Sequence, residues 1–593
     1  MQYYAEHLST DRVDESLNGT FTVKYNNEYF IKTNDCDLVP VKNNNRALHG
    51  DQVYYHNDVD TGENIIVGIK ERLNHQVPGV IILNKTKIMG KNTKNVPIYQ
   101  CSPVDSKYPN FTIASNIKKN LDPKLGVKNY YVLIQFHQWT AKQKFPMARQ
   151  ISVIGHVGDL NSELKVILYN NKIFHKHYRN VKLSGLAEPR KILYERRKFT
   201  DNVYAIDPQG AKDFDDAFHV VIGEYGKITE IGVHIADVTA YFNETGCYEN
   251  EILKRLSTIY MINGKYNMIP DKFADNMCSL KAGEPRLAVS VIFGYGGDSD
   301  FEDVIISQEF VLSEIVVSNN MTYEYANELL ARGDNQILNS LADLFKVNDS
   351  HVIVEKLMIM ANAAVGKRLY EAGYGLIRTQ QHCTGKFDSS KADVELAHHL
   401  LNRSSTSAEY HFNPEYVSHF RLGMDYYTHF TSPIRRYPDI LVHRLLKTFV
   451  IGSDVACTLE SVDIEMLCQR INVYYKQIKR MYRQQDILKL YHIINEEHAG
   501  IYVTKGVPVE YNAGVIYVFL PEFDLEYKYR IYSKKIAHLV TETISDNKIE
   551  FAVAEETSLI NLYNIELYKE YDVQLITNTV TTYINHKIKL RLQ

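Results

Sequence analysis

Four aspartates lie within ten residues of the stretch AIDPQGAKDFDDAFHV (205–220), and Lys212 is the only lysine or arginine among them. Two unit negative charges 4 Å apart repel by about 1 kcal/mol in water and by several times more near protein. A cation must therefore offset this charge. Carboxylates without ammonium partners are the ligands that hard divalent cations such as Mg²⁺ and Ca²⁺ prefer. The four residues are Asp207, Asp213, Asp215 and Asp216.

The spacing of these aspartates excludes a calcium loop of the EF-hand type. Counted from Asp207, position 6 is Lys212 where that loop needs glycine, and position 12 is Phe218 where it needs glutamate. The remaining interpretation is a magnesium site with coordination positions open for phosphate, as in two-metal phosphodiester hydrolysis. The alternative is a solvated acidic loop, which is the commoner explanation for an arbitrary Asp-rich stretch. The apolar flanks argue against that alternative.

The aspartates must be positioned by a strand and a loop. Asp207 precedes Pro208, which favours extended geometry at the mouth of a loop. In an extended chain Asp213 and Asp215 would share one face while Asp216 takes the other.

A second candidate group is the arginine pair of SPIRRYPD, Arg435 and Arg436. Pro433 and Pro438 are too close together for one helix interior to contain both, so we predict a turn followed by a helix that begins near Pro438. Arginines just before a helix N-terminus suit a phosphate group. The alternative is a structural ion pair with Asp439, which we favour for Arg436 and not for Arg435.

The bulk composition describes an ordinary globular protein. A length of 593 residues, 45% apolar and 23% charged, allows roughly three to five domains. The net charge of −4 gives no global attraction to nucleic acid, although a local basic channel can still exist. Seven scattered cysteines without Cys-x-x-Cys spacing argue against disulfides and zinc. No signal peptide and no run of about eighteen apolar residues is present, so we expect a cytoplasmic protein without a membrane partner.

Hydrophobic patterning divides the chain into β-rich ends and a mixed centre. Residues 1–180 contain short alternating runs, with no long amphipathic helix between them, which favours two five-stranded barrels of the oligonucleotide-binding (OB) kind. A β-sandwich is the alternative for this region. Strand-like segments after residue 200 precede helical patterns, and short strands return after residue 500. Helices are predicted over 322–333, 352–373 and 462–497.

Several sequence blocks resemble those of the RNase II/RNase R family of exoribonucleases, in the family's order. IDPQGAKDFDDA and YYTHFTSPIRRYPDILVHRLL resemble its catalytic (RNB) domain, as do VHIADVTAYF and YNMIPDKFADNMCSLKAGEPRLAVSVIF. NRALHGDQV is similar to the end of the first cold-shock domain. WTAKQKFPMARQISVIGHVGDLNSE is similar to the second cold-shock domain of the eukaryotic branch, which includes the catalytic subunit of the exosome. The C-terminal residues take the place of the family's S1 domain.

This resemblance implies a multidomain α+β protein with two cold-shock-like OB barrels, a mixed α/β RNB catalytic domain and an S1-like OB barrel. It also implies processive 3′→5′ hydrolysis of single-stranded RNA to nucleoside 5′-monophosphates, with Mg²⁺ as cofactor, for which Mn²⁺ can substitute. The expected domain boundaries are 1–75, 76–180, 190–498 and 499–593.

The same resemblance implies roles for individual residues. The four aspartates Asp207, Asp213, Asp215 and Asp216 are the expected metal ligands and catalytic residues, and one of the adjacent pair positions the attacking water. Arg435 is expected to stabilise charge at the scissile phosphate. Arg436 is a candidate contact to the substrate.

Tyr260 in STIYMIN matches the aromatic residue that stacks on the 3′-terminal bases. Such stacking is worth about 1–3 kcal/mol per base. The sequence departs from the family at Ile262, which replaces a proline and leaves the rigidity of this loop open. His234 and His443 are expected to be structural, because a metal-bound water needs no imidazole, and Asp237 is expected to support the site.

The basic run YYKQIKRMYR is most often a solvated helix face. The resemblance implies that this helix lines the RNA channel, which makes Lys479 and Arg480 candidate substrate contacts. The chain begins at the first cold-shock domain, without a counterpart of the PIN domain that tethers the exosome's catalytic subunit. We therefore expect a monomer that acts on single-stranded RNA and is not a subunit of the exosome ring.

Two other functions compete with this one. The first is an RNA-binding regulator with an inactive site, but such relatives lose the aspartates, and all four are present here. The second is a nuclease that prefers DNA. The family recognises RNA through its 2′-hydroxyl groups, and the sequence does not locate those contacts, so this alternative stays open.

Overall fold

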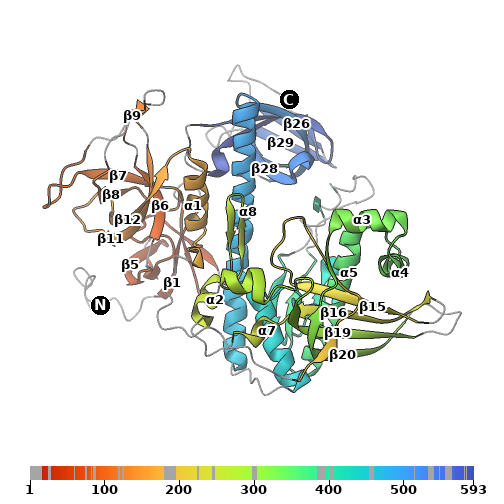
Figure 1. The fold of residues 1–593 in the computed structure, drawn as a ribbon. Helices are drawn as coiled ribbons and strands as arrows, with labels where there is room; N and C mark the ends of the chain where they lie inside the picture. Colours follow the sequence, from red (N-terminus) through yellow and green to blue (C-terminus); the bar gives the residue numbers. More distant parts are fainter. Residues whose placement is uncertain are drawn as a thin grey trace. The chain divides into compact units, whose positions relative to one another are not determined.

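In the computed structural model, the chain folds into small β-barrels, a large mixed sheet covered by helices, and one long helix (Figure 1). The structure describes residues 17–24, 28–35, 37–58, 61–73, 76–81, 83, 88–117, 121–122, 126–127, 129–178, 195–223, 226–242, 248–296, 304–382, 396, 399–400, 406–452, 460–512, 514–531, 540–545, 548–553, 564–579, 581 and 584–592.

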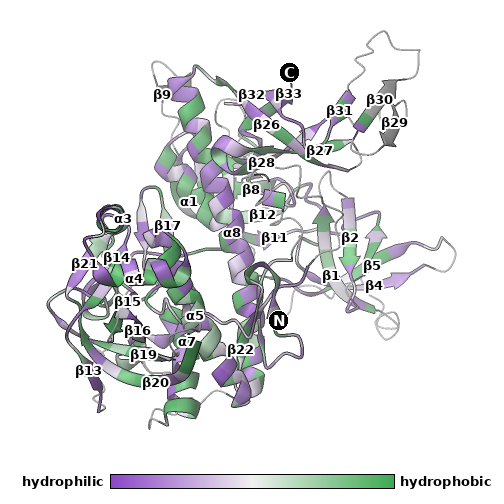
Figure 2. Cartoon of the chain, turned by 90° about the vertical axis from the view of Figure 1, so that its right-hand side faces the viewer, coloured by the Kyte–Doolittle hydropathy of each residue, from purple (hydrophilic) through white to green (hydrophobic). Residues whose placement is uncertain are grey.

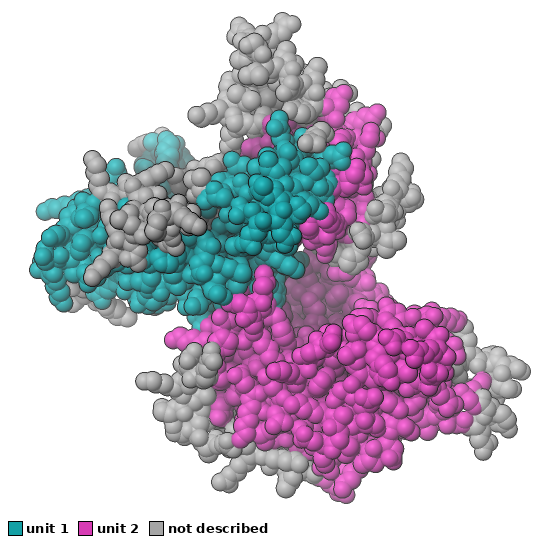
Figure 3. Space-filling model, turned by 45° about the horizontal axis from the view of Figure 1, so that its top comes forward, with its two compact units in different colours: residues 1–174, 479–504, 572–593 teal, residues 175–478, 505–571 magenta. Residues whose placement is uncertain are grey.

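The chain forms two compact units, which we describe separately (Figure 3). Unit 1 comprises residues 1–174, 479–504 and 572–593, and unit 2 comprises residues 175–478 and 505–571. The division into four domains with the boundaries given above stays a prediction. Five of those boundary positions, 1, 75, 180, 190 and 593, lie outside the described residues.

The first N-terminal barrel forms because apolar residues alternate along its strands. Phe21 and Val23 are buried while their neighbours in the strand are more exposed, which puts one side of the strand into the core. The strands close in the order β1-β2-β3-β5-β4. They are β1 (Leu17–Lys24), β2 (Glu28–Lys32), β3 (Leu38–Val41), β4 (Gln52–Asn57) and β5 (Asn64–Glu71).

The second barrel closes in the order β11-β12-β8-β7-β6 and buries Phe111, Val132 and Ile134. It is followed by α1, which the hydrophobic pattern did not predict and whose N-terminus is capped by the Asp159 carboxylate. Two closed barrels confirm the predicted OB architecture and exclude the β-sandwich alternative. The elements are β6 (Gln76–Ile81), β7 (Ile98–Pro103), β8 (Phe111–Ala114), β9 (Leu121–Asp122), β10 (Gly126–Val127), β11 (Tyr130–Gln138), β12 (Met147–His156) and α1 (Leu160–Asn170).

Unit 2 is built on a seven-stranded sheet in the order β13-β20-β19-β16-β15-β14-β21. Its central pairs are antiparallel, whereas β13 with β20 and β14 with β21 are parallel. The strands are β13 (Arg197–Phe199), β14 (Val203–Asp207), β15 (Asp216–Ile222), β16 (Ile228–Ala236), β19 (Pro285–Gly296), β20 (Val304–Val316) and β21 (Asn319–Thr322).

Helix α5 contacts β16 and β19 of this sheet, and α7 contacts α5. The predicted helices are confirmed, since Gly333 ends α3 in left-handed geometry and Pro438 stands in the first turn of α7. Hydrophilic and hydrophobic residues are interspersed along α8 (Figure 2). The helices are α2 (Glu249–Arg255), α3 (Tyr323–Arg332), α4 (Gln336–Phe345), α5 (Ser350–Glu371), α7 (Tyr437–Leu446) and α8 (Ser461–Glu497).

Short elements connect the longer strands and helices of unit 2. Three are two-stranded sheets, and four are single 3₁₀ or π turns. They are β17 (Ile259–Met261) with β18 (Gly264–Tyr266), β22 (Leu376–Thr379) with β23 (Glu409–Phe412), β24 (Ser418–His419) with β25 (Met424–Asp425), η5 (Val238–Ala240), η6 (Phe273–Met277), η8 (Phe420–Leu422) and η9 (Lys447–Ile451).

The C-terminal strands form two sheets, ordered β28-β27-β26-β32-β33 and β29-β30-β31, so the described strands there do not complete a closed barrel. Among the described helices, none has the length and apolar character needed to cross a membrane. Cys101, Cys278 and Cys468 are free, and the other four cysteines lie outside the described residues. The elements are β26 (Ile501–Asn512), β27 (Val515–Leu520), η10 (Pro521–Phe523), β28 (Leu525–Arg530), β29 (Val540–Ser545), β30 (Lys548–Val553), β31 (Asn564–Glu566), β32 (Tyr571–Thr577), η12 (Ile584–His586) and β33 (Ile588–Leu592).

Candidate active site

Two of the four aspartates lie at the facing ends of neighbouring strands. Asp207 is the last residue of β14 and Asp216 is the first residue of β15. The two strands pair in antiparallel fashion, with Tyr204 opposite Phe218, so the loop 208–215 connects them at one end of the strand pair. The extended geometry expected for Asp207 is confirmed.

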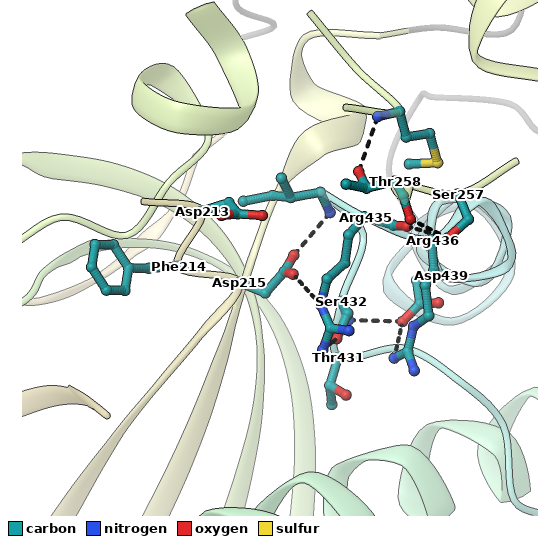
Figure 4. Close-up of polar contacts among 12 residues, drawn as sticks. Asp213, Phe214, Asp215, Ser257, Thr258, Thr431, Ser432, Arg435, Arg436 and Asp439 are labelled. Carbon is teal, nitrogen blue, oxygen red and sulfur yellow. Dashed lines mark hydrogen bonds and ion pairs between the residues drawn. The ribbon is translucent and has the colours of Figure 1, made fainter. Parts of the chain in front are cut away.

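The other two aspartates lie in the loop before β15, rather than on the alternating faces of a strand. Ser279 fixes this loop, because its hydroxyl donates to Lys212 O at 2.8 Å and accepts from Phe214 N at 3.1 Å. Phe214 points away from Arg435, whereas Asp215 points toward it (Figure 4). Loop geometry therefore decides where Asp213 and Asp215 point.

Asp215 joins the aspartate loop to the arginine turn. Its Oδ1 accepts from Ile434 N at 2.8 Å and its Oδ2 from Arg435 Nε at 3.2 Å (Figure 4). The Arg435 carbonyl accepts from Thr258 N at 3.0 Å and from the Ser257 hydroxyl at 3.0 Å, which fixes the backbone of the turn. The Arg435 side chain is still 44% exposed, so part of the guanidinium is open to a ligand.

Arg436 has a different environment from Arg435. Its Nη2 donates to Asp439 Oδ1 at 2.7 Å, and Asp439 is fully buried. The same carboxylate oxygen accepts from Ser432 N at 2.7 Å (Figure 4). Arg436 thus forms the structural ion pair that we favoured for it, and its contact with substrate stays a prediction.

Tyr260 lies on a short hairpin beside the aspartates. It is 40% exposed while its neighbours Ile259 and Met261 are buried, as expected for alternating positions of β17. The segment that contains Ile262, where the family has a proline, forms a paired β-hairpin with a two-residue turn. The Tyr260 hydroxyl donates to Asp213 Oδ2 at 2.9 Å. The structure therefore brings together the four aspartates, both arginines and Tyr260.

Burial governs the electrostatics of this cluster. It raises the pKa of Asp207 to about 8, with further contributions from Asp216 and Asp215. It also raises the pKa of Asp215 to about 8, although the Arg435 guanidinium acts in the opposite direction. The pKa of Asp216 rises to about 6 for the same reason. Without a cation, the site therefore favours the protonated carboxyls, and ionising the whole cluster requires positive charge that the protein itself does not supply.

The donor set fits a hard divalent cation. Asp207 Oδ2 is buried without a hydrogen-bond partner, and all the candidate ligands are carboxylates. The carboxylate oxygens of Asp213 and Asp215 accept hydrogen bonds from donors of the protein itself. Among the described residues, no three His, Cys, Asp or Glu side chains lie close enough together, in their present orientations, to hold a metal ion. Metal coordination by the aspartates stays a prediction.

Without a divalent cation, the wild type should lose thermal stability between pH 5 and pH 8, and Asp207→Asn should lose less. The folded pKa of Asp207 is about 8 against an ordinary value of 3.8, so across this window the folded state keeps a proton that the unfolded state has released. Rising pH therefore favours unfolding, and Mg²⁺ should offset the loss by binding the folded state. Melting temperatures in EDTA and in Mg²⁺ measure both effects, and equal pH slopes for the two proteins in EDTA would contradict this assignment.

The remaining sequence candidates belong to the other unit or are structural. Lys479 and Arg480 are exposed on α8 in unit 1, whereas the aspartates belong to unit 2, so their contact with RNA stays a prediction. The buried His234 ring lies 2.7 Å from both His219 Nδ1 and Ser290 Oγ. His443 Nε2 lies 2.8 Å from Phe430 O. Both histidines have the structural environment that we expected.

Sequence reasoning missed several residues that support the site. Lys265 donates to Asp213 Oδ1 at 2.9 Å and to Asp275 Oδ1 at 2.7 Å. Lys447 and Arg196 were missed as well. Both donate to the buried Asp237, which was expected to support the site, and they hold the pKa of its carboxyl well below the usual range. For Lys265, the only local signal in the sequence was that it is the basic residue of the turn-like segment INGKYN.

The fold and the site define an RNB-type nuclease architecture. Residues 196–347 and 339–452 match the RNB domain, and residues 98–172 match the Dis3-like cold-shock domain 2 (CSD2). The chain therefore belongs to the RNB family, the RNase II/RNase R family that its motifs resemble.

Among curated relatives, the chain is 25% identical over 489 residues to the probable exosome complex exonuclease RRP44 of Caenorhabditis elegans, covering 67% of this chain and 50% of that protein. The chain spans about half the length of these curated relatives. Among solved structures, the apo form of Mycoplasma genitalium RNase R superposes with a TM-score of 0.75 at 19% identity, covering 97% of this chain and 100% of that one. Yeast Ssd1, a pseudonuclease, superposes with a TM-score of 0.72 at 17% identity, covering 100% and 99%. At these identities the two structures show the fold alone.

Proposed function

We propose that this protein is a processive 3′→5′ exoribonuclease that hydrolyses single-stranded RNA to nucleoside 5′-monophosphates with Mg²⁺. The observation that carries the proposal is the meeting of the aspartate loop with the arginine turn through Asp215 and Arg435. This arrangement puts carboxylates for a cation beside an exposed guanidinium for a phosphate. A metal ion and a phosphate-binding guanidinium each assist phosphodiester hydrolysis.

Asp207, Asp213, Asp215 and Asp216 would hold Mg²⁺. When bound, Mg²⁺ supplies Lewis-acid polarisation of the phosphate and a more acidic water. The Arg435 guanidinium, fixed by Asp215, donates to the scissile phosphate and stabilises its developing charge. The Tyr260 ring stacks on a terminal base and sets the depth to which the 3′ end enters. One of the two adjacent carboxylates, Asp215 or Asp216, orients the attacking water.

The fold alone does not separate an active enzyme from an inactive one, because a pseudonuclease shares it. All four aspartates and Arg435 are present and gathered in this chain, which supports an active site. A 5′-labelled single-stranded RNA, its DNA twin and a blunt duplex, each with Mg²⁺ or EDTA, test the proposal. We expect Mg²⁺-dependent shortening of the single-stranded RNA. Stable RNA under all conditions would support the RNA-binding regulator, and equal loss of DNA would support the DNA nuclease.

Tyr260→Ala should leave the rate on long RNA largely unchanged and make the final undegraded fragment longer. A long substrate is held by many contacts, so the loss of one stacking contact is diluted. A short substrate keeps only the contacts near the aspartates, where about 1–3 kcal/mol corresponds to about 5–150-fold in affinity. High-resolution gels of a 5′-labelled 30-mer measure the fragment length. Tyr260→Phe keeps the ring and should keep the wild-type length. Identical end products for Tyr260→Ala and wild type would assign the ring to packing alone.

We also propose that the protein acts as a cytoplasmic monomer on single-stranded RNA. M. genitalium RNase R, whose fold this chain shares, has been solved with ribose-methylated single-stranded RNA (TM-score 0.74, 18% identity, covering 97% of this chain and 100% of that one). The mass of the protein in solution, with and without RNA, tests the oligomeric state.

A further inference from the structure

Asp213 differs from the other three aspartates in how the protein holds it. Its Oδ1 accepts from Lys265 Nζ at 2.9 Å, and its Oδ2 accepts from the Tyr260 hydroxyl at 2.9 Å. Tyr260 and Lys265 are direct cross-strand partners in the β17–β18 hairpin. Side chains on directly opposed strand positions lie close together. One hairpin therefore holds both oxygens of this carboxylate.

Lys265 is itself held from a second side. Its Nζ donates to Asp275 Oδ1 at 2.7 Å, and Asp275 lies in the π-helical turn η6. The Lys265 side chain is 25% exposed, so the bridge is shielded in part from water. An ammonium group fixed between two carboxylates has one defined position, unlike a lysine in a single exposed ion pair. Asp213 is thereby tied to η6 as well as to the hairpin.

We propose that Lys265 is a positioning residue of the active site, which keeps Asp213 oriented toward the other aspartates when Tyr260 engages RNA. The inference rests on the proposed function. The tyrosine that stacks on a base also holds Asp213, so movement of its ring toward RNA removes one of the two donors. The Lys265–Asp275 bridge is then the contact that retains the carboxylate as a metal ligand.

The two ways in which Lys265 can act on a bound cation have opposite signs. As a mere counter-ion, its positive charge repels the cation, so its removal should tighten metal binding. As a positioning residue, it orients a ligand, so its removal should weaken metal binding. Outer partners of metal ligands typically contribute about 10–100-fold in metal affinity or activity. The sign of the change therefore separates the two roles.

The experiment measures Mn²⁺ binding to the full-length protein without RNA, from the electron paramagnetic resonance signal of free Mn²⁺. We expect Lys265→Met to weaken binding by about 10-fold or more, and Lys265→Arg, which keeps the charge and the donors, to restore most of it. Lys254→Met, at an exposed lysine of α2, is the matched control and should bind as the wild type does. Unchanged or tighter binding by Lys265→Met would overturn the proposal.

Asp275→Asn supplies an independent variant, because it removes the negative charge from the same bridge and leaves Lys265 and all four aspartates in place. It should also weaken Mn²⁺ binding, and adding it to Lys265→Met should have little further effect, since both act through one bridge. Wild-type binding by Asp275→Asn would overturn the proposal even if Lys265→Met failed to fold. A wild-type protein that binds no Mn²⁺ would overturn the proposed function together with this inference. Metal-dependent RNA cleavage with equal Mn²⁺ affinities in wild type and both variants would overturn only the positioning role.

Discussion

Replacing Asp215 with asparagine should abolish RNA hydrolysis and leave RNA affinity close to that of the wild type. Asparagine keeps the shape of the side chain and can still accept from Ile434 N, but it removes one negative charge from the aspartate cluster. Even the outer partners of metal ligands contribute about 10–100-fold in activity, so the loss of a ligand should exceed the upper end of that range. Binding along the rest of the RNA depends on other groups.

Single-turnover cleavage and equilibrium binding of the same 30-mer measure these two quantities. Asp201→Asn is the matched control, since Asp201 is an exposed aspartate just before β14 and should tolerate the change. Activity of Asp215→Asn above a few per cent of wild type would contradict the assignment of the cluster. Loss of RNA binding together with activity would show that Asp215 serves folding instead.

The second large effect separates the two adjacent arginines. Arg435→Ala should lower kcat by about 10²–10³-fold, the range found when one preorganised donor to a developing charge is removed. Arg436→Ala should instead lower the free energy of unfolding by about 3–5 kcal/mol, because it leaves the fully buried Asp439 carboxylate without its cation. Rates under saturating RNA and urea unfolding curves, measured on both variants, distinguish the two roles. A catalytic loss in Arg436→Ala at wild-type stability would reverse the assignment.

Local sequence signals predicted much of the fold. Alternating apolar residues in β1 lead directly to its alternating burial, and the helix that ends at Gly333 has its stop signal in the sequence. Pro438 likewise marks the start of α7. The same kind of signal was available for α1, because Asp159 precedes an apolar-periodic segment and caps it. That helix was missed because the segment follows closely on a β-rich pattern.

The candidate site was predictable in its residue types and not in its contacts. Family-like motifs identified the aspartates, Arg435 and Tyr260, since each lies within a short distinctive stretch. The contacts between them join positions far apart in the chain, such as Asp215 and Arg435, which are 220 residues apart. The Lys265–Asp213 contact spans 52 residues and depends on the register of the β17–β18 hairpin. No local pattern encodes that register.

The most direct test of the proposed function follows the first nucleotide released from an RNA. A single-stranded 30-mer carries one radioactive phosphate, in the linkage before its 3′-terminal nucleotide, and thin-layer chromatography separates the products formed with Mg²⁺. We predict that the label appears at the earliest times as a nucleoside 5′-monophosphate, while the remainder of each chain is still long, and that EDTA prevents its release. Label that stays in long RNA, or that leaves within oligonucleotides, would contradict a 3′→5′ hydrolytic exoribonuclease.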